Sequence, residues 1–432
     1  MNKFLINTSA AAIALSFFTL LATPINAASA PGTKPVLKIT GESKFSGHFF
    51  QNNNRNPKTG IKDRGEKSNK THFGVEDTRI NLQMVGRADW FGQIKYDWLV
   101  GLTGDNDKET IVENRLRVKG HWGTFLIGDH YGVENFMARG AFAVMGGVGG
   151  FDGNWHDVVN TPTGVLFTTD LVGTTKYATK ATYLTPRVGG LQAGFSYAPN
   201  SEHRANGKPH NQTSIKKPPE AFDVNSWAGG INFEHEFANT MQIALSATGI
   251  LASTKSPQSR SKPIADPTYR FYETTNRKDT ASYALGGTAE YRGFELGAEW
   301  IDNGRSRQPG QSSGILAPDG TVLSGFNAGR AYSFATGYTY GLHKVALGYY
   351  HSERKFSGPK SKANVYSVTY DRQLAPGLSL YGEANQFDLK TSKAAVNAQQ
   401  AIYKGAPDSS KPAAPTANNK GHAVVIGGKF RF

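Results

Sequence analysis

The residue types that could carry out chemistry are scattered along the chain, and no spacing joins them into a catalytic or metal-binding set. Three histidines and one serine are the candidates for a base and a nucleophile: His121, His130, His351 and Ser352. Hydrolysis would need these side chains side by side, and their positions in the sequence do not show this. The glycine-rich residues 146–150 follow no predicted strand and open no helix, so they suit a tight inward loop and not a phosphate-binding loop. We therefore predict no enzyme, no catalytic residue, no metal ion and no cofactor.

A set of basic residues offers a different chemistry, the attraction of anions. Arg115, Arg117 and Lys119 alternate with apolar residues, so a strand would place the three basic side chains on one face. Two arginines of an earlier segment share this polar parity and complete the set, which we call the basic wall: Arg79, Arg87, Arg115, Arg117 and Lys119. A charged side chain that faces lipid near the midplane costs about 2 to 4 kcal/mol, so we expect all five to line an aqueous lumen. The alternative is that they are solvated or paired with Glu113 and Glu42.

The elements that must position these residues are strands with one apolar and one polar face. Apolar and polar residues alternate in segments of about ten residues through nearly the whole body of the chain, and about ten residues is the length of a tilted membrane-crossing strand. Residues 37–49 near the start and 424–432 at the end show the pattern. The periodic segments predict an all-β fold, a transmembrane antiparallel β-barrel of about sixteen strands.

Short and long connections alternate between these segments. The long ones lie near 51–71, 131–174, 199–223, 252–279, 303–329, 353–362 and 389–420, and tight turns such as 292–293 separate them. Outer-membrane barrels carry short periplasmic turns and long extracellular loops, which gives the predicted orientation. A soluble β-sandwich also alternates, but its strands average about five or six residues. A barrel of this size encloses an aqueous channel, which accounts for a hydrophobic content of only 38%.

The N-terminus reads as an export signal. A basic residue, an apolar stretch and small residues follow one another as in a secretory signal peptide, with cleavage near Ala27. We predict a signal peptide over 1–27 and one barrel domain over 28–432. Removal of the signal peptide takes away only Lys3 among the charged residues. The mature chain therefore keeps 47 basic and 34 acidic residues and a net charge of +13. An exported chain meets phosphorylated lipids, sugars and small anions, so no nucleic acid partner is expected.

Several segments resemble the general diffusion porins of Gram-negative outer membranes. The similar segments are 114–120 with 123–131, 183–186 with 189–197, 368–374 with 378–381, and the C-terminal 427–432. The resemblance implies a homotrimer in outer-membrane lipid and lipopolysaccharide, with a loop at 131–174 that folds inward and narrows the channel opposite the basic wall. The acidic candidates on that loop are Glu134, Asp152 and Asp157. The family usually has a basic residue at the position of Asp129.

The chain ends on an alternating aromatic strand. Phe430 and Phe432 share the parity that faces lipid, where they would anchor an aromatic girdle. The resemblance implies that such an end is also the signal for outer-membrane assembly.

The resemblance and the charge pattern lead us to expect a channel for passive diffusion of small hydrophilic solutes and ions in the outer membrane, with weak anion selectivity. The first alternative is a solute-specific anion channel, for example for phosphate. A barrel adhesin or an outer-membrane hydrolase is the second alternative.

Overall fold

The computed structural model describes residues 32–51, 71–89, 94–103, 111–159, 161–162, 164–166, 169–201, 222–255, 277–308, 315–316, 322–323, 326–355, 360–392 and 418–432. The predicted signal peptide at 1–27 lies outside the described residues. Among the helices of the described ranges, none is both long and apolar enough to cross a membrane.

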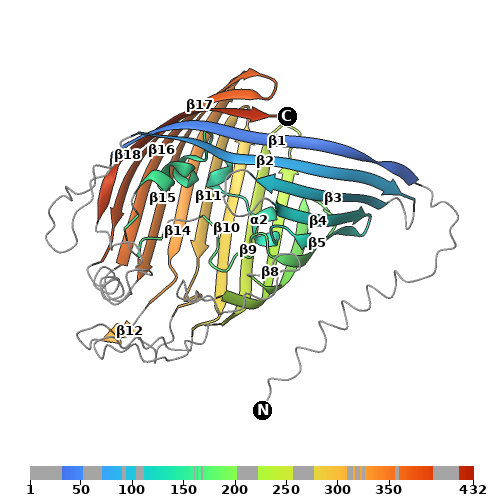
Figure 1. Cartoon of the computed structure of the whole chain (residues 1–432), viewed down its shortest axis with the longest axis horizontal. Helices are drawn as coiled ribbons and strands as arrows, with labels where there is room; N and C mark the ends of the chain where they lie inside the picture. Colours follow the sequence, from blue (N-terminus) through green and yellow to red (C-terminus); the bar gives the residue numbers. More distant parts are fainter. Residues whose placement is uncertain are drawn as a thin grey trace, which may run out of the picture.

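Sixteen antiparallel strands of the described residues close into one barrel (Figure 1). In chain order they are β1 (Gly32–Gln51), β2 (Thr71–Ala88), β3 (Ile94–Thr103), β4 (Ile111–Gly120), β5 (Gly123–Asp129), β6 (Thr179–Leu184), β7 (Leu191–Asn200), β8 (Phe222–Glu236), β9 (Gln242–Lys255), β10 (Thr280–Tyr291), β11 (Phe294–Asp302), β14 (Arg330–Tyr340), β15 (His343–Lys355), β16 (Lys360–Ala375), β17 (Leu378–Lys390) and β18 (Asn419–Arg431). A separate two-stranded sheet joins β12 (Ile315–Leu316) to β13 (Val322–Leu323). The barrel confirms the predicted fold class and the predicted number of strands.

Pairing of β1 with β18 closes the barrel and runs to the last residue of the chain. Glu42 lies opposite Arg431 in the register, and the N–H of Gly41 donates to the carbonyl of Phe432 over 2.9 Å. A Cβ at position 41 would lie 2.5 Å from the Phe432 ring, so a side chain there would displace this ring. Phe430 and Phe432 are 49% and 57% exposed on the outer face, with ring centroids 6.0 Å apart. The terminal aromatic pair therefore lies on the side that faces lipid.

Strand alternation sorts side chains between lipid and lumen. On β3 the outward Trp98 is 45% exposed, whereas the neighbouring inward side chains of Asp97 and Leu99 are buried. The short turns 292–293, 341–342 and 376–377 join hairpins at one end. Gly341 (φ +57°) and Gly377 (φ +78°) adopt left-handed backbone in two of these turns, a conformation that glycine reaches without strain.

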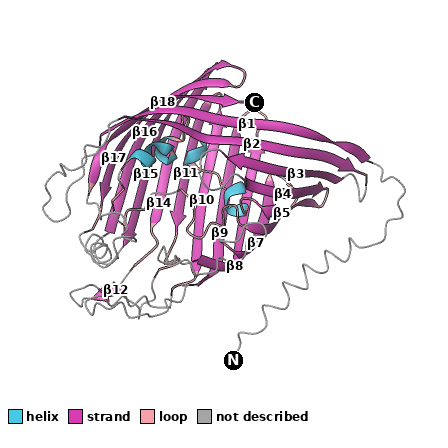
Figure 2. Cartoon of the chain, in the orientation of Figure 1, coloured by secondary structure: helices cyan, strands magenta, loops and turns pink. Residues whose placement is uncertain are grey.

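The segment between β5 and β6 lies inside the barrel, where Figure 2 draws its helices in cyan. Its helices are α2 (Val133–Phe136), η1 (Ala141–Ala143), η2 (Gly150–Asp152) and η3 (Asn154–Val158). α2 packs against β7 to β9, and η1 packs against β10, β11 and β14. η2 packs against β15 to β17, and η3 packs against β18 and β1. Large buried side chains gather where this segment meets the wall, among them Met137, Phe151, Trp155, Tyr350 and Phe387. We call residues 130–178 the inner loop, which extends slightly beyond the predicted 131–174.

Candidate functional site

The glycine-rich part of the inner loop is bound by two carboxylates of the barrel wall. The N–H of Gly147 donates to Asp371 Oδ2 on β16 over 2.6 Å. The N–H groups of Val148 and Gly150 donate to Glu383 Oε2 on β17 over 3.1 and 3.2 Å. A Cβ at position 146 would lie 2.0 Å from the Asp371 carboxylate. The run 146–150 therefore forms a tight loop whose N–H groups are bound by the protein itself, three of them by carboxylates of the wall.

The second half of the inner loop returns along the wall and is also held by hydrogen bonds. Ser352 on β15 donates to the carbonyl of Leu166. The N–H of Val172 donates to Asn303 Oδ1 over 2.8 Å, and Ser282 on β10 donates to the carbonyl of Val172 over 2.8 Å. Both halves of the loop are thus fixed to the inner surface of the barrel.

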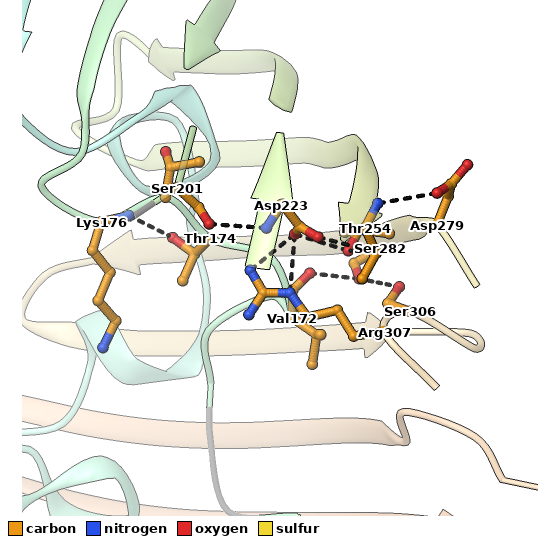
Figure 3. Close-up of polar contacts among 12 residues, drawn as sticks. Val172, Thr174, Lys176, Ser201, Asp223, Thr254, Asp279, Ser282, Ser306 and Arg307 are labelled. Atoms are coloured by element: carbon orange, nitrogen blue, oxygen red, sulfur yellow. Dashed lines mark hydrogen bonds and ion pairs between the residues drawn. The ribbon is translucent and has the colours of Figure 1, made fainter. Parts of the chain in front are cut away.

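A buried aspartate lies beside this return path (Figure 3). Asp223 on β8 is fully buried, and its carboxylate binds Arg307 Nη2 at 2.9 Å. Thr254 and Thr280 each donate to it over 2.9 Å. The Ser282 hydroxyl that holds the inner loop lies 2.9 Å from that of Ser306. This cluster therefore joins the ends of β8, β9 and β10 near the long loops to one another and, through Ser282, to the inner loop.

The helices of the inner loop pack on β1, β7 to β11 and β14 to β18, which leaves the wall formed by β2, β3 and β4 facing the lumen. Tyr177, near the end of the inner loop, reaches this wall, and its hydroxyl accepts from Arg79 Nη1 over 3.3 Å. Five side chains of this wall form a charge network: Arg79, Asp97, Glu113, Arg115 and Arg117. Glu113 binds Arg79 and also accepts from Arg115 Nε over 2.6 Å. Asp97 binds Arg115 Nη1 at 3.2 Å and Arg117 Nε at 2.5 Å. Each carboxylate therefore bridges two guanidinium groups.

The charge network resolves the alternatives left by the sequence for the basic wall. Arg79 and Arg115 pair with Glu113, as one alternative proposed, whereas Glu42 binds Arg431 and Lys44. Asp97 was not among the predicted site residues. The signal for it was available, because it alternates with outward aromatic residues on the segment that became β3.

Arg87 and Lys119, the other two members of the basic wall, lie outside the charge network. Both side chains are exposed, and neither makes an ion pair within the described residues. They occupy the end of β2 and the end of β4 nearest the short turns. The predicted basic wall thus has three arginines that pair with carboxylates and two basic residues, Arg87 and Lys119, that make no ion pair within the described residues.

The predicted acidic residues of the inner loop have different environments. Glu134 is only 4% exposed, and it accepts from the Thr174 hydroxyl over 3.1 Å and from the N–H of Thr175 over 3.3 Å. It therefore joins the two ends of the loop to each other and does not face the channel. The side chain of Asp157 lies outside the described part of the chain.

Asp152 is an exposed acidic residue of the inner loop. Its side chain accepts from the Thr169 hydroxyl over 2.7 Å. The surrounding protein mass desolvates the carboxylate and raises the pKa of Asp152 to about 6, with a smaller contribution from the negative charge of Asp170. Asp170, which binds Lys176 at 3.6 Å, is a second loop acid that the sequence reasoning missed.

The histidine and serine candidates for hydrolysis are not brought together. Ser352 points inward and is fully buried, whereas the neighbouring His351 points outward and contacts Asn364 Oδ1 over 2.8 Å. Burial lowers the pKa of His130 to about 4, and its Nδ1 bonds to the carbonyl of Tyr131. His121 lies in the turn between β4 and β5. Within the described residues, no group of three His, Cys, Asp or Glu side chains is placed to hold a metal ion.

Comparisons with known proteins give a consistent result. A family model described as Gram-negative porin matches residues 9–392. An uncharacterised protein of Rickettsia bellii is 27% identical over 278 residues, which cover 59% of this chain and 57% of that protein. One of Rickettsia felis is 23% identical over 285 residues, which cover 60% of this chain and 58% of that protein. The chain therefore spans less than two thirds of the length of these relatives.

Solved structures with a similar fold include a porin and an outer-membrane protein. The anion-selective porin from Comamonas acidovorans has a TM-score of 0.53 at 13% identity, with 92% of this chain and 100% of that chain covered. OmpT of Vibrio cholerae, folded in vitro, has a TM-score of 0.53 at 11% identity, with 94% and 100% covered. At these identities the likeness shows the fold alone.

Proposed function

Because the chain belongs to the Gram-negative porin family, we propose that it forms a water-filled channel through which small hydrophilic solutes and ions diffuse passively, with a weak preference for anions. The observation that carries the proposal is the arrangement of the lumen. The helices of the inner loop pack on the strands from β7 round to β1, and the charge network lies on β2 to β4, where Arg79 also contacts the loop through Tyr177. We expect a solute to pass along the charge network.

The charges of the wall formed by β2, β3 and β4 support the proposed anion preference. In the charge network three guanidinium groups face two carboxylates, which leaves one net positive charge. Arg87, Lys95 and Lys119 add positive charge toward the short turns. Asp152 on the opposite side adds a negative charge when it is ionised. The partial cancellation supports a modest preference and not a strict one.

We also propose the assembly and the surroundings that the family resemblance implies. The chain would be exported by a signal peptide over 1–27, would assemble as a homotrimer in contact with outer-membrane lipid and lipopolysaccharide, and would use Phe432 as part of its assembly signal. The outward position of Phe430 and Phe432 supports the last point. The short turns would then face the periplasm and the long loops the outside.

A reversal-potential measurement on single channels in a KCl gradient tests the selectivity. The wild type should show a small anion preference. Replacing Arg115 and Arg117 with Ser leaves Arg79 alone against Asp97 and Glu113, so the reversal potential should shift toward cations. Replacing Lys216 and Lys217, which lie in a predicted long loop, is the control. It should barely change the potential, because a charge more than about 8 Å away is largely screened at 0.15 M salt.

A clearly cation-selective wild type would contradict the proposed preference. A purified protein that forms no conducting pore in the bilayer would contradict the channel function itself.

A further inference from the structure

Three basic side chains form a row at the short-turn end of the wall opposite the inner loop. Arg87 on β2 lies opposite Lys95 on β3 in the register, and Lys95 lies opposite Lys119 on β4. We call these three residues the mouth row. All three are exposed. They have the same parity as the charge network and therefore point into the lumen, because Lys95 and Lys119 are each two residues from a member of that network.

The mouth row lacks the neutralisation found elsewhere on this wall. Among the described residues, none of its three side chains makes an ion pair or a side-chain hydrogen bond. Two residues further along the same strands, Asp97 and Arg117 pair at 2.5 Å. Like charges directly opposite each other on neighbouring strands destabilise a sheet. Two such pairs in succession, without a carboxylate between them, therefore form a preorganised site for an external anion.

The dimensions of the mouth row select the class of anion. Neighbouring strands are about 4.8 Å apart, so the row spans roughly 10 Å from Arg87 to Lys119. A single chloride ion can meet only part of this row, whereas a chain of two or three phosphates can engage all three cations at once. Arg binds phosphate oxygens through two parallel hydrogen bonds, and Lys binds them as a point charge.

We propose that the mouth row binds polyvalent phosphate anions at the short-turn entrance of the channel and retains them there while chloride passes. This inference rests on the proposed function, since it needs an open lumen that reaches the row. The ligand comes from solution and not from lipid headgroups, because the row has the parity of the lumen.

The test is the block of single-channel current by pyrophosphate and tripolyphosphate. Added to wild-type channels in KCl, both anions should reduce the current, and tripolyphosphate should act at the lower concentration. The triple variant R87S/K95S/K119S should still form a pore that conducts KCl, and it should need at least tenfold more of either anion for half block. The charge-conserving variant R87K/K95R/K119R should keep the block.

A matched control removes the same amount of charge from the outer face. Lys355, Lys362 and Lys420 are exposed at the long-loop end with outward parity, so K355S/K362S/K420S should leave the block unchanged. Repeating the block in bilayers of purely zwitterionic lipid and in bilayers with anionic lipid should give the same result if the ligand is a solute.

The absence of cysteine gives a second and independent readout. In the variant K119C, a methanethiosulfonate reagent that carries an ammonium group should restore the block, and one that carries a sulfonate should abolish it. A conducting channel that pyrophosphate and tripolyphosphate never block, or whose block survives R87S/K95S/K119S, overturns the inference and leaves the channel function intact. Failure to form a pore would instead overturn the proposed function.

Discussion

Replacing Gly146 with Ala should loosen the inner loop without weakening the barrel. The added Cβ would lie 2.0 Å from Asp371 Oδ2, whereas an ordinary carbon–oxygen contact is about 3.4 Å. The carboxylate is not free to turn away, because Lys429 Nζ binds its other oxygen at 2.8 Å. The loop must therefore move inward by about 1 Å or more.

This movement breaks specific hydrogen bonds. The bond from Gly147 to Asp371 is 2.6 Å long, and a shift of that size takes it beyond the usual limit of about 3.2 Å. A hydrogen bond to a charged group contributes about 1.5 to 3 kcal/mol. Since about 1.4 kcal/mol is a tenfold change in an equilibrium constant, the released form of this segment should become roughly 10- to 100-fold more populated.

Single-channel recording is the assay. The Gly146→Ala channel should show a changed conductance and more open-channel noise than the wild type. Its resistance to heat unfolding in detergent should be unchanged, because the strand pairing of β16 and β17 is not touched. Gly229→Ala is the matched control, since a Cβ there meets nothing within 4 Å. A Gly146→Ala channel with wild-type conductance and noise would refute the argument that the carboxylates of β16 and β17 hold the loop.

Three further predictions test other parts of the structure. The anion preference should decrease as the pH rises through about 6, because Asp152 becomes negatively charged there. Reversal potentials measured across this pH range should show the decrease in the wild type and not in Asp152→Asn. If the variant keeps the decrease, another group causes it. Deleting Phe432 should lower the amount of barrel in the outer membrane, measured by immunoblot of membrane fractions, and normal amounts would make the terminal aromatic residue incidental. Tags near residues 206 and 263 should react with impermeant reagents on intact cells and tags near 92 and 341 should not; the opposite labelling would reverse the proposed orientation.

The sequence predicted the fold well because a barrel imposes the same requirement on every strand. Lipid on one face and water on the other produce an alternation of period two, which is visible without any knowledge of pairing. The inward parity of Arg115 and Arg117 follows from the same pattern, and their contacts with inward Asp97 agree with it.

The partners of these residues could not be predicted in the same way. A shift of the register by two residues leaves every side chain on its own face, so the alternation does not say which carboxylate meets which arginine. Glu113 was named as a possible partner of the basic side chains, whereas Asp97, which binds across strands, was not. Glu134 was named as an acidic residue of the narrowing loop because of the family resemblance, which says nothing about its partners. Its partners Thr174 and Thr175 lie at the other end of the inner loop, and only the folded loop brings them together.

The separation between the charge network and the mouth row determines how the two can act on one solute. The rows are two residues apart along β3 and β4, from Lys95 to Asp97 and from Arg117 to Lys119, which is about 7 Å at the rise of an antiparallel strand. The Debye length at physiological salt is about 8 Å, so an anion held at the mouth row still lies within the field of Arg117. Asp97 and Glu113 offset much of that field, because each binds two guanidinium groups. The charge network should therefore attract a polyvalent anion less strongly than the proposed mouth row, so the anion should stay at the row.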